Sequence, residues 1–306
     1  MADVPEGGAR AQGLDLSTSQ RLPGAWPPAG SVWLRRPSVL IGLAIVTLFV
    51  VIAVAAPLLA PHDPTAIDAA RRLEGPSRGS PLGTDDLGRD LLSRLLYGSR
   101  WSLGTVGAAT ALIMSIGVAI GALAGYFGGL VDELLMRVVD VLLALPSLLL
   151  ALAIAGTLGP GIGNVMLALV SVWWAGYARV VRGMVLVLRE RRFIEAARAL
   201  GVREGYIILR HVLRNVVPPV VVLATVEMGE LILAIAGLNF LGLGAQPPTP
   251  EWGAMLNDGR PFLFTAPQLM IYPGLAISLL VIGFNLLGDG LRDALDPRLR
   301  SGGVPQ

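Results

Sequence analysis

The 306-residue sequence contains no cysteine and no lysine, and it has only two histidines. Without cysteine there is no disulfide, no thiolate nucleophile and no thiolate metal ligand. All 24 basic residues are arginine, so the chain lacks the lysine that a Walker A loop places on nucleotide phosphates. His62 and His211 are too few for a histidine-based metal centre. These absences disfavour hydrolytic catalysis and a nucleotide-driven motor within this chain.

Charge is also scarce, because 15% of the residues are charged while 54% are hydrophobic. Soluble domains are about a quarter charged, so the composition indicates a membrane protein. A transmembrane helix needs about 20 mostly apolar residues, and six stretches meet this requirement. We therefore expect an all-α membrane protein with six transmembrane helices. The predicted spans are Val39–Ala60, Leu103–Tyr126, Val138–Leu158 (containing Pro146), Gly163–Val181, Val216–Leu238 and Leu269–Gly288.

The arginines are distributed unevenly over the segments between these spans. If the N-terminus lies inside, the inner segments carry 17 arginines and the outer segments carry 7. Cytoplasmic loops of membrane proteins are enriched in Lys and Arg. The distribution therefore predicts that both termini are cytoplasmic.

A polar passage with nine arginines, from Arg179 to Arg214, separates the fourth and fifth spans. Helix-forming residues run from Val181 to Leu200, and Gly201 is placed where a glycine commonly ends a helix. A second helix is expected from Arg203 to Val212. We call the passage at about 182–214 the hairpin and place it in the cytoplasm.

The hairpin presents small residues before its turn, namely Glu195, Ala196 and Ala197, with Ile194 and Leu200 as apolar projections. Such a face suits a groove on a partner protein. An amphipathic helix on anionic lipid headgroups is the alternative, and spacing alone favours neither. Binding to nucleic acid is a poor third interpretation, because no aromatic platform accompanies the arginines.

Two acids, Glu227 and Glu230, fall inside the fifth span, three residues apart and so on one helix face. An acid at mid-membrane costs about 2.5–3.5 kcal/mol on insertion scales. They are candidates for lining a translocation pathway. The alternative is a protonated or hydrogen-bonded acid that clamps a neighbouring helix.

Three smaller features carry structural expectations. Thr84 is expected to cap a short interfacial helix that precedes the second span. Trp252 is expected to anchor a second outer loop at the membrane interface. Arg137 is expected to form intrahelical ion pairs with Glu133 and Asp140.

The segment Glu195-Ala196-Ala197, followed by three residues and Gly201, resembles the EAA loop of bacterial ABC importer permeases. Further segments resemble the dipeptide/oligopeptide/nickel branch of the second-subunit type, over roughly residues 35 to 300. One departure is Arg214 in place of a usual proline, which is expected to leave the start of the fifth span less kinked. The matching segments are Gly83–Leu103 (GTDDLGRDLLSRLLYGSRWSL), Asp140–Ile154 (DVLLALPSLLLALAI), Tyr177–Gly183 (YARVVRG), Leu238–Leu256 (LNFLGLGAQPPTPEWGAML) and Phe284–Arg300 (FNLLGDGLRDALDPRLR).

The resemblance implies a type I ABC importer permease fold in a bacterial inner (plasma) membrane. It also implies that Glu195, Ala196, Ala197, Leu200 and Gly201 form the coupling helix that contacts an ATPase. The implied partners are a homologous second permease, two cytoplasmic ABC ATPases, an extracytoplasmic substrate-binding protein and membrane lipid, but no nucleic acid. ATP and Mg would be used by the ATPases, and this chain would bind no cofactor and catalyse nothing.

The implied domain division has four parts: a disordered cytoplasmic tail (1–36), the first transmembrane helix with an extracytoplasmic segment (37–100), a five-helix permease domain (101–289) and a cytoplasmic C-terminal tail (290–306). The expected cargo is a di- or oligopeptide, with a nickel chelate or another solute as the alternative. A secondary transporter driven by an ion gradient and a purely structural membrane subunit are the rival classes.

Overall fold

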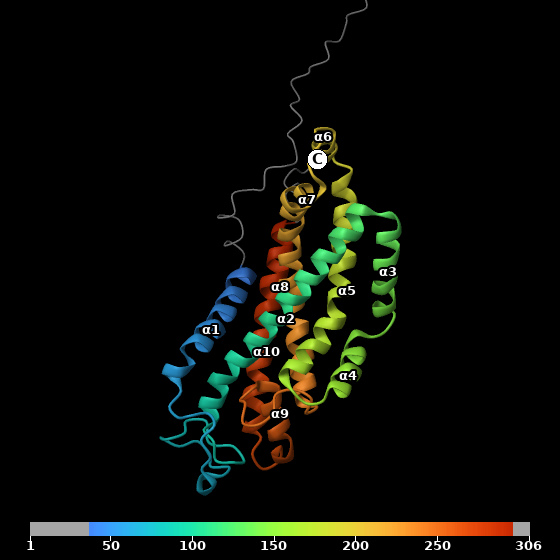
Figure 1. Ribbon diagram of the computed structural model, residues 1–306. Coiled ribbons are helices and arrows are strands. Elements are labelled where there is room, and N and C mark those ends of the chain that lie inside the picture. The colour runs from blue at the N-terminus through green and yellow to red at the C-terminus, as the bar shows by residue number, and fades with distance from the viewer. Residues whose placement is uncertain (1–36, 296–306) are drawn as a thin grey trace, which may run out of the picture.

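The computed structural model describes residues 37–295, and these residues are almost entirely helical (Figure 1). The predicted tail at 1–36 and most of the predicted C-terminal tail lie outside the described residues. Within the described range β-structure is limited to one isolated bridge between Thr84 and Asp90. The helices are α1 (Pro37–Leu59), η2 (Ala69–Arg71), α2 (Leu91–Phe127), α3 (Gly129–Leu143), α4 (Ser147–Leu158), α5 (Ile162–Arg189), α6 (Arg192–Ala199), α7 (Glu204–Tyr206), the π-helical η3 (Ile207–Val212), α8 (Leu213–Phe240), α9 (Trp252–Gly259), η4 (Arg260–Phe262) and α10 (Gln268–Leu295).

Five of the described helical segments are long and apolar enough to cross a membrane, and α3 with α4 forms a sixth, bent candidate. The helix α2 ends, and α5 begins, at opposite ends of the bundle (Figure 1). The α3–α4 pair therefore carries the chain across between them, which gives six crossings in the described range. The six-helix prediction is confirmed.

The third crossing is not the single helix that the sequence predicts. Its two halves, α3 and α4, are bent by 87° at a short break that contains Pro146. Proline lacks a backbone N–H and disfavours the helical conformation at the residue before it. Pro146 accordingly becomes the N-cap of α4, and the apolar composition alone did not show the bend.

A row of glycines brings α2 and α5 into close contact. A Cβ atom on Gly121 would lie 2.5 Å from the Ala178 carbonyl oxygen, and one on Gly117 would lie 2.4 Å from Cβ of Tyr177. Together with Gly125, these glycines repeat every fourth residue on one face of α2. Small residues at this spacing allow membrane helices to approach closely, so α2 and α5 form the tightly packed centre of the bundle.

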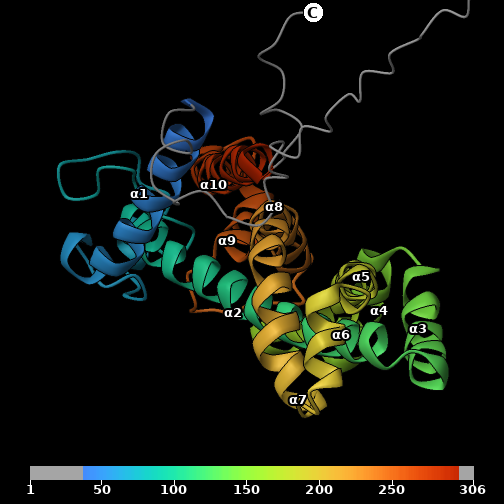
Figure 2. The same ribbon diagram turned by 90° about the horizontal axis from the view of Figure 1, so that it is seen from above.

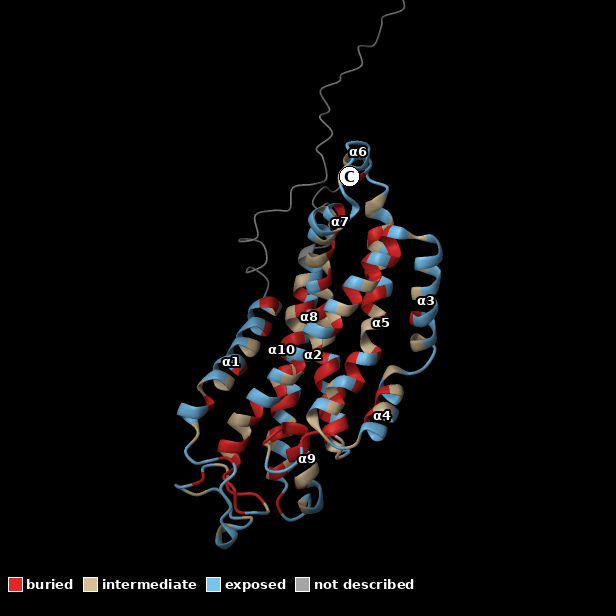
Figure 3. Ribbon diagram, in the orientation of Figure 1, coloured by how far each residue is buried: buried red, intermediate tan, exposed pale blue. Residues whose placement is uncertain are grey.

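The helices α1 and α3 lie at opposite edges of this centre (Figure 2). Buried residues follow α2, α5 and α8, whereas α1 and α3 are largely exposed (Figure 3). Val54 and Leu58 of α1 are 76% and 89% exposed, and exposed apolar side chains of this kind suit contact with lipid.

Ion pairs fasten α3 to α5. Asp132 accepts hydrogen bonds from Arg182, with 2.6 Å between Nη2 and Oδ2. Asp140 pairs with Arg179 of α5, so its predicted pairing with Arg137 is wrong. The predicted pair of Arg137 with Glu133 is present at 3.2 Å.

The start of α1, the end of α10 and the pair α6–α7 lie at one end of the bundle, and α9 lies at the other (Figure 1). We call these the hairpin end and the α9 end. The helix α10 continues to Leu295, so the first residues of the predicted C-terminal tail are helical.

Candidate coupling hairpin, membrane acids and outer surface

The first arm of the hairpin is divided into two helices. The helix α5 ends at Arg189, and α6 starts at Arg192 after the non-helical residues Glu190 and Arg191. The continuous helix predicted from Val181 to Leu200 is therefore wrong in detail. The predicted end of the arm is confirmed, because Gly201 has φ +74° and its N–H donates to the Arg198 carbonyl at 2.9 Å.

The residues of α6 have two clearly different faces. Ile194 is fully buried against the bundle, so the expectation that it projects outward is wrong. Glu195 and Ala196 are exposed, Ala197 is partly buried, and Leu200 is 83% exposed. The structure thus leaves a short face of small and charged residues open, with two exposed apolar side chains beside it, Phe193 (45%) and Leu200 (83%).

The second arm merges with the fifth span. The predicted helix from Arg203 to Val212 is instead α7 followed by the π-helical turn η3, which continues directly into α8. Ile207 is fully buried, whereas Leu209 is 70% exposed. The chain passes Arg214 without a break in the helix, as expected in the absence of proline at that position.

The two membrane acids of α8 have different surroundings. The carboxyl group of Glu227 is partly buried and lies near the Tyr177 hydroxyl of α5. Glu230 is exposed and forms no hydrogen bond or ion pair with any residue in the range 37–295. The structure therefore places one acid at a helix–helix contact and the other on the open face of α8.

A buried group of charges at the α9 end was not predicted from the sequence. We call Asp85, Arg89, Arg94 and Asp258 the outer charge cluster. Arg89 and Arg94 are each 2% exposed, and their Nε atoms lie 2.6 and 3.3 Å from Oδ2 of Asp85. Oδ2 of Asp258, on α9, lies 3.5 Å from Nη2 of Arg94.

Burial raises the pKa of Asp258, and the two arginines of the outer charge cluster oppose this shift. The cluster fastens the segment before α2 to α9.

Two expectations about this end are wrong. Trp252 is 1% exposed rather than at an interface, and its Nε1 donates to the Leu95 carbonyl at 3.0 Å. The helix α2 is capped by Asp90, not by Thr84, and it runs without a break into the second span. Sequence spacing cannot show either contact, because each depends on which segments meet in the fold.

Glu251 begins α9 as a buried cap. Its carboxylate accepts hydrogen bonds from the Ala254 N–H and the Ser102 hydroxyl, each at 2.9 Å. Burial raises the pKa of Glu251, and these hydrogen bonds partly offset the shift. The cap ties α9 to α2 next to Trp252.

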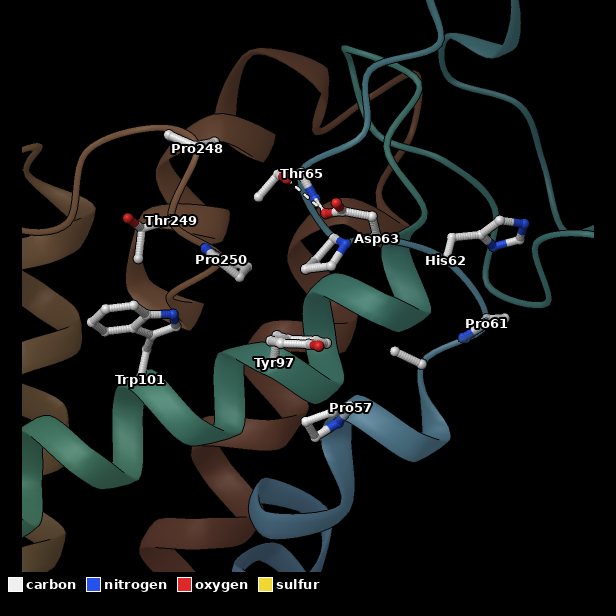
Figure 4. A pocket seen from close by; sticks show the side chains of 12 residues that line it. Pro57, Pro61, His62, Asp63, Thr65, Tyr97, Trp101, Pro248, Thr249 and Pro250 are labelled. Atoms are coloured by element: carbon white, nitrogen blue, oxygen red, sulfur yellow. Dashed lines mark hydrogen bonds between the residues drawn. The ribbon is translucent and has the colours of Figure 1, made fainter.

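An open pocket of about 610 Å³ lies at the same end (Figure 4). It joins the end of α1, the start of α2 and the loop before α9, and proline and aromatic side chains, Tyr97 and Trp101 among them, line it. On its rim, Asp63 accepts hydrogen bonds from the N–H and hydroxyl of Thr65 (2.8 and 2.6 Å), which lower the pKa of Asp63. The pocket is a surface hollow at the end opposite α6.

Six crossings, a largely apolar outer surface and an exposed short helix at one end define a multi-pass membrane protein that presents a helix outside the membrane. Comparison with known families identifies it further. Residues 117–301 match the family of binding-protein-dependent transport system inner membrane components, and residues 29–76 match the N-terminal transmembrane domain of oligopeptide transport permease C. The chain belongs to this family of ABC importer permeases, in its dipeptide/oligopeptide/nickel group.

Individual relatives agree with this assignment. The dipeptide transport system permease protein DppC of Alkalihalophilus pseudofirmus is 45% identical, over 90% of this chain and 91% of its own length. The nickel transport system permease protein NikC of Escherichia coli K12 is 44% identical, over 86% and 95%. The glutathione transport system permease protein GsiD of Pectobacterium atrosepticum is 47% identical, over 84% and 85%.

A solved structure shares the fold. A chain of the inward-facing MetNI methionine ABC transporter superposes with a TM-score of 0.50 at 19% identity, covering 67% of this chain and 98% of that one. The predicted ABC importer permease fold is confirmed. The protein is a multi-pass inner-membrane permease, and its family is one of transport subunits rather than enzymes.

Proposed function

We propose that this chain forms half of the translocation pathway of an ATP-driven peptide importer, and that α6 couples it to a cytoplasmic ATPase. The observation that carries the proposal is the divided surface of α6. Ile194 is buried against the bundle while Glu195, Ala196 and Leu200 face outward. A fixed helix with an open face of small residues is suited to a groove on another protein.

The same observation weighs against the lipid interpretation. A helix that lies on headgroups must direct its apolar face into the membrane. In α6 the central apolar residue, Ile194, already packs against the bundle. The outward face carries Glu195, and the exposed Arg192 and Arg198 flank it. The half-exposed Phe193 lies beside the His211 ring, 6.2 Å between centroids, within the hairpin. The outward face is therefore suited to protein contact.

The open face of α8 supports a role in the pathway. Glu230 is exposed in the isolated chain, and an acid facing lipid at mid-span is costly. This face is therefore expected to meet water or a second protein subunit rather than lipid. A homologous permease placed there would enclose a passage lined by Glu230, with Glu227 behind it.

The relatives favour a peptide cargo, because two of the three are named for transport of a dipeptide or glutathione and one for transport of nickel. The complete importer would contain the second permease, two ATPases that use ATP and Mg, and an extracytoplasmic binding protein. ATP binding would draw the ATPases together, and α6 would pass this movement to the bundle so that the outer gate opens. Hydrolysis would restore the inward-facing state.

The coupling role is tested at the turn and on the exposed face. Proline requires φ near −65°, whereas Gly201 has φ +74°, so Gly201→Pro should displace the turn. Ala197→Trp and Ala196→Trp place bulk within the proposed contact. Each is expected to reduce co-purification of the ATPases by about tenfold or more, as for an interface hot spot. Leu130→Trp is the control, because Leu130 is 75% exposed at the same end but lies on α3. Wild-type ATPase recovery with the three hairpin variants would contradict the coupling role.

The pathway acids are tested by Glu227→Gln/Glu230→Gln. We expect uptake of cationic peptides to change relative to neutral ones, because the negative charge on the passage is removed. The control is Glu133→Gln, an exposed acid on α3. Unchanged affinity and rate for peptides of every charge would assign both acids a structural role. Uptake that collapses with an uncoupler but persists without the ATPases would instead indicate a gradient-driven transporter.

A further inference from the structure

Short non-helical connections link α6 to the neighbouring helices. Two non-helical residues, Glu190 and Arg191, connect it to α5, and the turn at Gly201 connects it to α7. The helical hydrogen bonding of α5 does not continue into α6, so the orientation of α6 depends on side-chain contacts as well as on the backbone.

Such a contact joins both arms of the hairpin to the end of α2. The Tyr126 hydroxyl, in the last turn of α2, donates a hydrogen bond to the Glu204 carboxylate of α7. The Arg198 guanidinium of α6 lies over the Tyr126 ring, 4.9 Å from its centroid, and 3.8 Å from Oε2 of Glu204. We call Tyr126, Arg198 and Glu204 the Tyr126 clamp. Its tyrosine is 4% exposed, so it lies beneath the hairpin and not on the face proposed for the ATPase.

The helix α2 leads from the clamp to the opposite end of the bundle. It is one continuous helix of 37 residues. At its far end Trp252 of α9 packs against Gly98 and bonds to Leu95, while the outer charge cluster fixes the preceding segment. A displacement of α2 at Tyr126 would therefore reach the surface at the α9 end.

We propose that Tyr126 is a positioning residue for energy coupling, which connects the hairpin to α2 so that movement of α6 is delivered to the α9 end. This inference rests on the proposed function of α6 and adds a route within the chain. The Glu204 carboxylate and the Arg198 cation hold the tyrosine through its hydroxyl and its ring face, respectively. A hydrogen bond to a charged group is strong enough to bias a two-state movement.

The test compares Tyr126→Phe with Tyr206→Phe in the complete transporter reconstituted in proteoliposomes. Both changes remove one hydroxyl from the same end of the chain, but Tyr206 is 56% exposed and contacts His211 only through its ring. The measured quantity is substrate taken up per ATP hydrolysed. For Tyr126→Phe we expect a fall of about tenfold, with unchanged co-purification of the ATPases, since one charged hydrogen bond is worth about that factor. Tyr206→Phe should match the wild type.

Glu204→Ala breaks the same hydrogen bond from its other partner and provides a second variant. Its loss of coupling should be at least that of Tyr126→Phe, because it also removes the contact with Arg198. The double variant should be no worse than Glu204→Ala alone, because that change already removes the hydrogen bond. An unchanged coupling ratio in both single variants, or losses that multiply in the double variant, would overturn the clamp. If the ATPases did not co-purify with the wild-type chain, the proposed coupling function would be contradicted. The role of the Tyr126 clamp would then be contradicted as well, because it depends on that function.

Discussion

Gly98 sets how closely α9 approaches α2. A Cβ atom at this position would lie 2.5 Å from Cδ1 of Trp252 and 2.9 Å from the Pro250 carbonyl oxygen. Trp252 is buried and its Nε1 is hydrogen-bonded, so it cannot turn aside freely. We therefore predict that Gly98→Ala lowers the midpoint of thermal unfolding in detergent, at a cost of about 1–3 kcal/mol for overpacking.

Gly104 provides the matched control for this substitution. It lies in the same helix, and a Cβ atom added there meets nothing within 4 Å. Gly104→Ala should be neutral or stabilising, since alanine favours helix over glycine by about 1 kcal/mol. Equal unfolding midpoints for the two variants would show that the contact with Trp252 tolerates the added methyl group.

Single residues differ in how far the sequence alone reveals their roles. Gly201 was predicted correctly, because a glycine after a helix-forming run has a local cause in the turn that it makes. Gly98, Trp252 and Tyr126 were not, since their contacts join distant segments; Tyr126 and Glu204 are 78 positions apart. A tryptophan in an outer loop predicts a position at the membrane interface, but it does not predict which neighbour covers the ring.

At the scale of the element, α3 is held to the bundle by one small apolar cluster around Val139 and by two ion pairs. Val139 is its only buried residue, whereas Asp132 pairs with Arg182 and Asp140 with Arg179. The side chains of the first pair are 17% and 33% exposed, and those of the second 67% and 51%. Water screens the more exposed pair, so the two should not contribute equally.

We predict that Asp132→Asn destabilises the protein by about 1–3 kcal/mol, the usual cost of losing a charged hydrogen bond. Asp140→Asn should cost less, at most about 1 kcal/mol. Thermal unfolding at low and high salt checks both, because added salt should diminish the Asp140 effect first. A larger effect at Asp140 would show that exposure does not rank these pairs.

The elements themselves were largely predictable, because each span is a run of apolar residues long enough to cross a bilayer. The breaks within these elements were harder to predict from the sequence. Pro146 was recognised inside the third span, yet a proline in a membrane helix is compatible with a kink or a break. The joint at Glu190 and Arg191 has no glycine or proline to mark it, and it lies in a run of good helix formers.

For the molecule as a whole, the composition predicts the six-helix fold. Only the structure shows which charged side chains are buried within it. The arginine count predicts that the hairpin lies inside the cell, and the structure sets the hairpin and α9 at opposite ends of the bundle. The seven arginines predicted for the outer segments include the buried Arg89 and Arg94, which pair with Asp85 and Asp258. Arginines neutralised within the fold contribute little to a surface excess of positive charge.

The orientation itself gives the last prediction. The chain contains no cysteine, so single cysteines can be introduced without a background. Leu200 is 83% exposed at the hairpin end, and Ile67 is 66% exposed in the segment between α1 and α2 at the α9 end. With the chain expressed without the ATPases, a membrane-impermeant maleimide should label Ile67→Cys and leave Leu200→Cys unmodified in spheroplasts, with the reverse pattern in inside-out vesicles. Labelling of Leu200→Cys from outside would place α6 away from the ATP-containing compartment, where no cytoplasmic ATPase could reach it.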